Sequence, residues 1–373
     1  MKITQHTWQA DKWSASVSLL QDAQLCLVFG SRFTLEKNPE FAAQLSAIYP
    51  KAEIVTSSTA GNIIDDSLLD DTLIATVVEF EKTRIRAQLF SMSGIPADEL
   101  GRNIATALDA EDLAGILLFS TMGINAGQLL SGLNEKLQGR VPVSGGVAGD
   151  DTRFERTLVG LNTNIAEAQI VAIGFYGKQL SVATGSKGGW DTFGPVRTVT
   201  KCAGNILYEI DNKPVLDLYK EYLGDKAASL PSSALLFPFT IIDSQTSEPV
   251  VRGVQNVDES TSSIILYGDV DKGMKIQLMR ANFDNLIHGA GDSAKESFIE
   301  NKSPELAVLI SCVARRLVLG QLTEEELTES RKVFGDKTVI CGFYSYSELS
   351  PLVGDNACHL HNQTMTITTF SEA

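Results

Sequence analysis

The sequence predicts an α+β fold of mixed α/β type, in which helices pack on mixed sheets. Its 373 residues exceed the usual length of a single domain, so we expect two domains. Strand candidates show both alternating and continuously apolar patterns, and helical stretches return between pairs of strands. Hydrophobic residues make up 43 % of the chain and charged residues 21 %, which supplies enough apolar material for a sizeable core.

A glycine-rich stretch marks the predicted domain boundary. Gly188-Gly189 and Gly194-Pro195 lie close together near the middle of the chain, and such residues interrupt regular elements. We therefore predict an N-terminal domain over residues 1–190 and a C-terminal domain over residues 191–373.

The first repeated unit begins with the apolar strand "LCLVFG" at 25–30. A helix is predicted over 38–50, because Asn38 is a favourable N-cap and Pro39 suits the first helical position. A second strand at 52–61 ends in glycine, and the acidic pair Asp65-Asp66 follows. Two alternating strands, "TLIATVVEF" and "TRIRAQLFS", then close the unit.

The second unit repeats this order with a strand at 114–120, a helix at 125–139 and a strand at 141–151. Asn125 is the expected N-cap of the helix and Gly139 its C-terminal stop. The acidic pair Asp150-Asp151 lies 85 residues after the first pair. This fixed offset indicates duplication of a strand-helix-strand unit.

A third, weaker unit lies near the C-terminus. The stretch 306–316 reads as a strand that runs into a helix or turn, and 338–350 as a second strand. Between them a helix is predicted over 323–335, with Thr323 as cap and Glu326 completing a capping box. Residues 359–370 are predicted to form the closing strand. Ahead of this unit, residues 281–300 have the apolar spacing of a helix.

Composition excludes several function classes. The net charge of −15 and the pI of about 4.8 disfavour binding to nucleic acid or anionic lipid. The first residues, "MKITQHTWQADKW", lack the apolar core of a secretory signal, and no run reaches the roughly 20 apolar residues of a membrane span. Five scattered cysteines form no C-x-x-C motif, and Cys26, Cys312 and Cys341 lie in apolar runs. We expect buried thiols and a cytoplasmic location.

The glycine-rich stretch "SGGVAGDD" (144–151) allows two interpretations. Gly145 and Gly146 follow a strand, where exposed N–H groups bind small ligands, but the same glycines also suit a tight turn with a β-bulge. Asp150 and Asp151 would repel a phosphate, and neither the P-loop nor the G-x-G-x-x-G pattern is present. Both a small-ligand site at these glycines and a purely structural turn remain open.

No catalytic signature stands out. Ser57, Ser144 and Cys341 are nucleophile candidates, but none lies in a G-x-S-x-G elbow or a Cys-His motif. Adjacent aspartates on a strand point to opposite faces, so they form a poor general acid/base pair. We expect a protein that is not an enzyme, and an enzyme of unknown class is the last alternative.

The four histidines are candidate ligands for iron. His359 and His361 alternate in the closing strand and would share one face. His288 lies beside the apolar stripe of the 281–300 helix, where an imidazole suits an axial haem position. His6 is expected at the periphery. For each histidine an ordinary structural role is the competing interpretation.

Five stretches together resemble the FIST family of bacterial sensory proteins, with its N-terminal and C-terminal FIST domains. They occur in the family's order from residue 58 to residue 367, so the resemblance covers nearly the whole chain. In the stretch at 342–351, Ser347 stands where many relatives have glycine. The stretches are "STAGN" (58–62), "SGGVAGDD" (144–151), "SCVARRLVLG" (311–320), "GFYSYSELSP" (342–351) and "LHNQTMTI" (360–367).

The resemblance implies a cytoplasmic sensor that relays a signal to a histidine kinase or to a cyclic-di-GMP synthase or phosphodiesterase. One branch of the family binds haem and senses nitric oxide, so haem is the expected cofactor. The alternative is a sensory module for a small amino-acid-like ligand without haem. Because "LHNQT" is shared across the family, His288 is the first candidate for the haem iron and His361 the second, followed by His359. Assembly into a homo-oligomer is left open.

The binding site is expected where the repeated strands end in glycine, at Gly61, Gly145, Gly146 and Gly342, because open sheets leave a crevice at strand ends. Aromatic walls are expected from Phe343, Tyr344 and Tyr346, with ordinary core packing as the alternative. The charged residues expected to pair with a polar ligand are Arg315, Arg316, Asp150 and Glu348.

Overall fold

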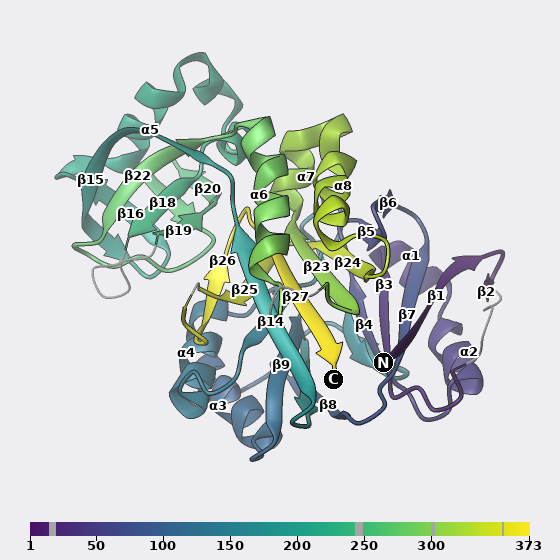
Figure 1. Cartoon of the computed structure of the whole chain (residues 1–373). Helices are drawn as coiled ribbons and strands as arrows, with labels where there is room; N and C mark the ends of the chain where they lie inside the picture. The colour runs from purple at the N-terminus through teal and green to yellow at the C-terminus, as the bar shows by residue number, and fades with distance from the viewer. Residues whose placement is uncertain (15–19, 243–248, 300–302, 353) are drawn as a thin grey trace.

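The computed structural model describes residues 1–14, 20–242, 249–299, 303–352 and 354–373. It is a mixed α/β structure with several mixed sheets and packed helices, which confirms the predicted fold class. Three of the sheets surround one core, and a fourth sheet forms a separate lobe beside them (Figure 1).

The first unit is a sheet in which β3 pairs with β4 in parallel and with β7 in antiparallel orientation, and β1 pairs with β7. Every residue of β3 is buried, as its continuous apolar pattern predicts. The elements are β1 (Lys2–Gln9), β2 (Lys12–Trp13), β3 (Leu25–Gly30), α1 (Arg32–Lys37), α2 (Phe41–Ile48), β4 (Glu53–Ser58) and β7 (Leu73–Glu79).

The second unit repeats this pattern. Strand β9 pairs with β10 in parallel and with β13 in antiparallel orientation, and β8 pairs with β13. Helix α4 begins after Asn125, whose side chain accepts a hydrogen bond from the Gln128 N–H, as predicted. The elements are β8 (Arg84–Ser91), α3 (Ala97–Leu108), β9 (Leu113–Ser120), α4 (Ala126–Leu137), β10 (Val143–Val147) and β13 (Gln169–Tyr176).

The third unit has the same arrangement, with β23 between β24 and β27 and with β14 on the outer edge. Its helices cover the outer face of the sheet (Figure 1). The elements are β14 (Leu180–Lys187), α6 (Phe283–Glu296), β23 (Leu306–Cys312), α7 (Val313–Leu319), η3 (Gly320–Leu322), α8 (Thr323–Phe334), β24 (Val339–Ser345) and β27 (Met365–Glu372).

The three units exchange hairpin arms in a closed ring. The arm of the first unit, β5–β6 (Asn62–Ile64 and Ser67–Leu69), pairs with β24 of the third. The arm of the third, β25–β26 (Ser347–Pro351 and Cys358–His361), pairs with β10 of the second. The arm of the second, β11–β12 (Val159–Leu161 and Asn164–Ala166), pairs with β4 of the first. The predicted repeat is therefore an interlocked triplet.

One apolar core lies between the three sheets. Phe29 of the first unit, Phe119 of the second and Phe343 of the third are fully buried there, with ring centroids 4.9 to 5.9 Å apart. Aromatic pairs at such distances add to the free energy gained by burying their area. The ends of β4, β10 and β24 meet beside this core, where the Gly149 N–H donates to the Ser58 carbonyl and the Tyr346 N–H to the Val147 carbonyl.

The fourth sheet has eight strands and a core of its own around Leu207, Tyr219 and Phe239. The chain enters this lobe after β14 and returns at α6, so residues on both sides of the predicted 190/191 boundary share the third sheet. The elements are β15 (Asp191–Ala203), β16 (Ile206–Ile210), β17 (Lys213–Pro214), α5 (Val215–Leu223), η1 (Gly224–Ser229), η2 (Ser232–Leu236), β18 (Phe239–Ile242), β19 (Pro249–Arg252), β20 (Val254–Asp258), β21 (Ser263–Leu266) and β22 (Lys275–Arg280).

Two predicted helix N-caps are wrong. The 38–50 stretch holds only α2, which begins at Phe41, and Asn38 ends the preceding α1 because its amide donates to the Thr34 carbonyl instead of capping α2. Thr323 does not cap α8, since its hydroxyl donates to the Gly320 carbonyl. The 281–300 helix begins at Phe283 after an Asn282 cap and ends at Glu296.

The predicted closing strand 359–370 is also two strands rather than one. Strand β26 ends at His361 in the second sheet, and β27 begins at Met365 in the third. Gln363 has φ +58° in the turn between them. The sequence did not reveal this change of sheet, because the alternation of apolar and polar residues continues through both strands.

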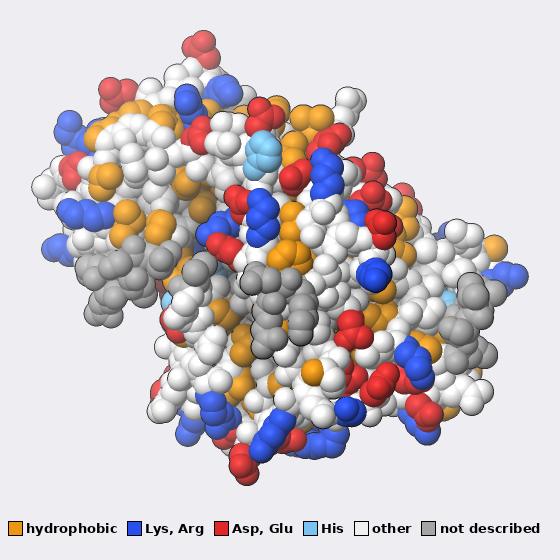
Figure 2. Space-filling model, viewed as in Figure 1, with side chains coloured by type: hydrophobic (Ala, Val, Ile, Leu, Met, Phe, Trp, Pro, Cys, Tyr) orange, Lys and Arg blue, Asp and Glu red, His pale blue; other side chains and the backbone are white. Residues whose placement is uncertain are grey.

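The surface and the cysteines follow the composition. Acidic and basic side chains are interspersed over the face in Figure 2 rather than gathered into one patch. Cys26, Cys312 and Cys341 are buried, as predicted. None of the helices in the described ranges combines the length and the apolarity that crossing a lipid bilayer requires. His6, expected at the periphery, is buried, with its Nε2 2.6 Å from the Oη of Tyr49 at the end of α2.

Candidate functional site

The predicted crevice at the glycines is filled by the chain itself. Gly145 and Gly342 each lie within a second strand, and a Cβ on either would stand 1.8 Å from a carbonyl oxygen of the neighbouring strand. Gly146 packs against Ile310 in the same interior. A Cβ on Gly61 would meet the Arg316 guanidinium at 2.5 Å. Gly145 and Gly342 permit close strand packing within their units, and Gly61 and Gly146 permit it between units. None of the four lines either of the two large cavities described below.

The three aromatic residues of the third unit have separate roles. Phe343 belongs to the central core, and Tyr344 is fully buried with its hydroxyl donating to Glu326 Oε1 at 2.8 Å. Tyr346 stacks on Phe154 with ring centroids 4.3 Å apart. Only Tyr346 lines one of the large cavities, so the predicted aromatic wall is reduced to this residue.

Arg315, expected to pair with a ligand, is fully buried in a structural network. Its guanidinium donates to Glu326 Oε2 at 2.7 Å and to the Leu286 carbonyl at 2.8 Å, and it also contacts the Gly188 carbonyl. A buried ion pair of this kind is costly to break, because the remaining charge loses both water and partner. Arg315 therefore joins α7, α8, α6 and the entry to the fourth sheet.

Asp150 and Arg316 are also engaged within the protein. Asp150, expected to pair with a polar ligand, is fully buried and accepts from Arg32 Nε at 2.9 Å. Arg316 pairs with Asp70 at 2.7 Å and contacts the Ala60 carbonyl. Asp65, by contrast, has φ +57° and a mostly exposed side chain. The two acidic pairs therefore differ in environment.

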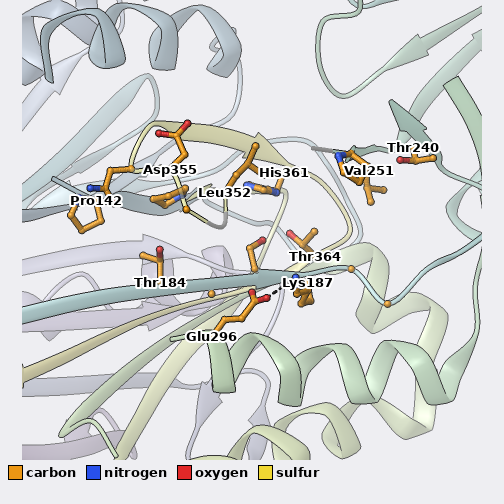
Figure 3. A pocket seen from close by; sticks show the side chains of 18 of the residues that line it. Pro142, Thr184, Lys187, Thr240, Val251, Glu296, Leu352, Asp355, His361 and Thr364 are labelled. Atoms are coloured by element: carbon orange, nitrogen blue, oxygen red, sulfur yellow. Dashed lines mark ion pairs between the residues drawn. The ribbon is translucent and has the colours of Figure 1, made fainter. Parts of the chain in front are cut away.

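A cavity of about 1100 Å³ lies between the fourth sheet and the three-sheet body, and we call it the His361 cavity. Figure 3 shows Thr240 and Val251 of the fourth sheet on one side and Thr184, Leu352 and Pro142 of the body on the other, with His361 between them. Lys187 of β14 and Glu296 of α6 form an ion pair of 2.6 Å at the same cavity (Figure 3).

His361 is buried, with 4 % of its surface exposed. Its Nε2 lies 3.0 Å from the Ser350 carbonyl across the β25–β26 hairpin, which favours the tautomer with the proton on Nε2. Burial lowers the pKa of His361 to about 4, despite the opposing effect of this hydrogen bond. At neutral pH the imidazole is therefore uncharged in the wall of the cavity.

The residues after His361 connect the fourth sheet to the body. The Gln363 carbonyl accepts from Trp190 Nε1 at 2.8 Å, and Asn362 Oδ1 accepts from the Gly253 N–H at 3.4 Å. The Arg252 guanidinium donates to the Leu360 carbonyl at 2.9 Å. The motif "LHNQT" therefore forms the joint between the two parts of the molecule, and a strand-orienting role for it agrees with these contacts.

Glu348 is a fully buried carboxyl group next to this joint. It accepts from Ser345 Oγ at 2.7 Å and from the Thr364 hydroxyl and N–H at 3.1 and 3.3 Å. Burial raises the pKa of Glu348 to about 8, although these hydrogen bonds oppose the shift. Thr364 also lines the His361 cavity, so Glu348 lies one side chain behind the cavity wall.

The other two candidate histidines lie outside the lining of this cavity. His288 is on the exposed face of α6. His359 is half-buried, with its Nε2 3.6 Å from Asp355. Alternation along β26 puts His359 and His361 on one face, as predicted, but only His361 reaches the cavity.

The described residues form no metal-binding cluster, and the three candidate nucleophiles are buried. No three His, Cys, Asp or Glu side chains there come together in an arrangement that could hold a metal ion. Ser57, Ser144 and Cys341 are all buried, and the Ser144 hydroxyl accepts from Thr368 at 2.6 Å. Burial raises the pKa of the Cys341 thiol to about 12, which opposes formation of a thiolate.

Several cavity residues were missed by the sequence. They belong to no motif and lie on three elements and the β14–β15 connection: Lys187, Trp190, Thr240 and Glu296. The one usable signal was Gly188-Gly189-Trp190, which was interpreted only as a domain boundary. Gly189 has φ +77°, and a Cβ there would stand 2.1 Å from the Asn285 carbonyl oxygen. These glycines let the chain pass close to α6 at the edge of the cavity.

Comparison with known proteins agrees with this architecture at the level of the family. The FIST N domain matches residues 24–213, and the FIST C domain matches residues 216–351. An uncharacterized protein of Methanocaldococcus jannaschii is 21 % identical over 314 residues, which cover 76 % of this chain and 59 % of the relative. The chain thus spans a little over half the length of that relative.

Two solved enzymes are distant structural neighbours. A chorismatase matches with a TM-score of 0.37 and 7 % identity over 99 % of this chain and 98 % of its own. The cyanuric acid hydrolase from A. caulinodans matches with a TM-score of 0.32 and 10 % identity, over 94 % and 90 % of the two chains. Similarity this low has no bearing on activity.

The chain is a mixed α/β protein with a large cavity between its fourth sheet and its three-sheet body. The chain belongs to the FIST family, whose N and C domains are sensory, ligand-binding domains. The family resemblance of the five motifs is thereby confirmed.

Proposed function

We propose that this protein senses a small polar ligand in the His361 cavity and binds it rather than transforming it. The observation that carries the proposal is that the fourth sheet and the three-sheet body both contribute residues to the cavity wall. Thr240, Val251 and Met279 of the fourth sheet line it together with Thr184 and His361 of the body. A ligand that contacts both parts changes the free energy of their relative arrangement, which is the requirement for a sensor.

The lining favours a ligand with both an amine and a carboxylate, such as an amino acid. Lys187 can bind a carboxylate, while Glu296 and the half-exposed Asp355 can bind an amine. Threonine hydroxyls and the neutral His361 add hydrogen-bonding groups without charge. The Lys187–Glu296 pair is partly exposed and therefore weak, so a zwitterion can replace it at little cost.

The joint supplies a route from the cavity to the rest of the molecule. Trp190 lines the cavity and holds the Gln363 carbonyl through its indole N–H. Thr364 lines the same cavity and holds Glu348 behind it. A ligand against Trp190 acts directly on a contact between the entry to the fourth sheet and the body, and a ligand against Thr364 acts on the buried Glu348.

Haem fits the cavity only in part. A histidine that binds a metal usually donates its other ring N–H to a carbonyl, and the bond from His361 to Ser350 meets this requirement. The two propionates of haem need cations, however, and Lys187 is the cation among the described lining residues, already paired with Glu296. Asp355 would repel a propionate. The residues therefore do not fit haem, and a haem-based nitric-oxide response stays a prediction.

Relay of the signal to a histidine kinase or to a cyclic-di-GMP enzyme, in the cytoplasm, also stays a prediction. Membership in a sensory family supports it.

A thermal-shift screen of the twenty amino acids, with haemin added separately, tests the proposal. A ligand that binds only the folded state should raise Tm by roughly 2–5 °C at a hundredfold excess over Kd. Thr184→Trp fills the cavity and should abolish the shift, whereas Thr106→Trp on the exposed face of α3 should leave it intact.

Two outcomes would overturn the proposal. One is a shift that Thr184→Trp leaves unchanged. The other is a sharp Soret band with haemin that disappears in His361→Ala while every amino acid fails to bind, which would restore the haem interpretation.

A further inference from the structure

A second large cavity, of about 1140 Å³, lies on the other side of β26, and we call it the Tyr346 cavity. It is lined by residues 121–127, which connect β9 to α4 and begin that helix, by Tyr346 and Phe154, and by residues 265–269 at and after the end of β21. Leu360 lines this cavity, and the next residue, His361, lines the other. Successive side chains of a strand point to opposite faces, so β26 separates the two cavities.

We propose that the Tyr346 cavity binds a ligand that combines a flat apolar ring with one positive charge. Such a ligand differs from the zwitterion proposed for the His361 cavity, because the two linings differ in charge. The inference does not depend on the function proposed for the His361 cavity.

The ring of the ligand has an aromatic and apolar wall to pack against. Tyr346 and Phe154 are stacked with an interplanar angle of 16°, and the Tyr346 hydroxyl is fixed by the Phe154 N–H at 3.0 Å. Tyr267 adds a third ring to the lining, and Met122 and Leu317 add adaptable apolar surface. Aromatic faces attract both flat apolar groups and cations.

The positive charge has one partner. Of the described residues that line this cavity, Asp269 has the only charged side chain, and the remaining polar groups are amides and hydroxyls. Asn125 Nδ2 donates to Asp269 Oδ2 at 3.3 Å at the beginning of α4, so the helix terminus already offsets part of the charge. The carboxylate is exposed, and it therefore contributes selectivity more than affinity.

Calorimetric titration of the purified chain with three matched probes tests this site. Benzylamine should bind saturably, benzyl alcohol should bind more weakly, and benzoate should not bind. Asp269→Asn should weaken benzylamine roughly three- to tenfold and leave benzyl alcohol unchanged. Asp271→Asn removes the same charge two residues away, outside the lining, and should have no effect.

Two further measurements locate the site and do not depend on Asp269→Asn being folded. Added salt should weaken benzylamine binding to the unmodified chain but not benzyl alcohol binding. Thr184→Trp, which fills the other cavity, should leave benzylamine affinity unchanged. The proposal is overturned if benzylamine shows no saturable binding, if benzyl alcohol binds as tightly, if the two aspartate variants behave alike, or if Thr184→Trp removes the binding.

Discussion

At the scale of single residues, the polar side chains of the sequence motifs are buried and bonded to other parts of the chain, rather than exposed to a ligand. Arg315, Asp150 and Glu348 were all expected to face a ligand, and each is fully buried with partners inside the protein. A motif records that a polar residue is required at a position. It does not distinguish a ligand outside the chain from a partner within it.

Glu348 gives a pH-dependent prediction. Its pKa is about 8 in the folded protein and 4.5 in the absence of burial, so between these values the folded state holds the proton more tightly than the unfolded state. The contribution of Glu348 to the free energy of unfolding therefore falls as pH rises from about 4.5 to about 8. Glu348→Gln removes this titration, so its Tm should rise relative to the unmodified chain between pH 5 and pH 8.

Thermal denaturation at several pH values measures the difference. Glu135→Gln, an exposed change of the same kind, should keep a constant offset from the unmodified chain over this range. A constant offset for Glu348→Gln as well would contradict a raised pKa in the folded state.

At the scale of elements, local patterns predicted most of the repeated strands and the main helices. Asn125 was predicted as a cap because its neighbours along the chain suffice to make it one. Asn38 and Thr323 are also residue types that favour the N-cap position, but their side chains donate hydrogen bonds to carbonyls of the preceding turn. The break between β26 and β27 depends on which sheet each strand joins, and that choice is non-local.

The candidate site was only partly predictable for the same reason. His361 belongs to a recognisable motif and does line a cavity. Lys187, Glu296 and Thr240 come together only because the fourth sheet folds back against β14 and α6. The spacing of residues along the chain does not indicate that the fourth sheet comes close to β14 and α6.

The glycine in β10 gives a prediction at this scale. Gly145 has φ +148°, and a Cβ there would stand 1.8 Å from the Leu118 carbonyl oxygen. Gly145→Ala should therefore lower the free energy of unfolding by at least about 3 kcal/mol, through backbone strain and overpacking together. Urea denaturation measures the loss.

A matched variant at Gly94 distinguishes backbone strain from overpacking. Gly94 also has positive φ, at +78°, but nothing lies within 4 Å of its Cβ position. Gly94→Ala should cost only about 1 kcal/mol, from backbone strain alone. Equal losses for the two variants would show that close packing of β10 against β9 is unimportant.

At the scale of the whole molecule, the three units cannot be separated at the boundary between the FIST domains. A chain ending at residue 213, where the FIST N match ends, would lack β25 as partner for β10 and β24 as partner for β5. It would also lose Ile310, Phe343 and Phe370 from the central core. The domain names therefore describe the sequence better than they describe independent folding units.

Truncation tests this statement. Residues 1–213 alone should give no cooperative thermal transition and poorly dispersed amide proton resonances, whereas the full chain should unfold cooperatively. A stable, cooperatively folded fragment would contradict an obligatory exchange of arms.

The exchange of arms has a consequence for the newly made chain as it leaves the ribosome. Ile64 of β5 pairs with Cys341 of β24, which is synthesised 277 residues later. At translation rates of about 5–20 residues per second, the interval is roughly 15–55 s. During that time the edges of the early strands have no partner, and unpaired edges readily join other chains. Assembly of the ring thus waits for the last part of translation, and protection of the nascent chain by chaperones should decide how much folded protein a cell obtains.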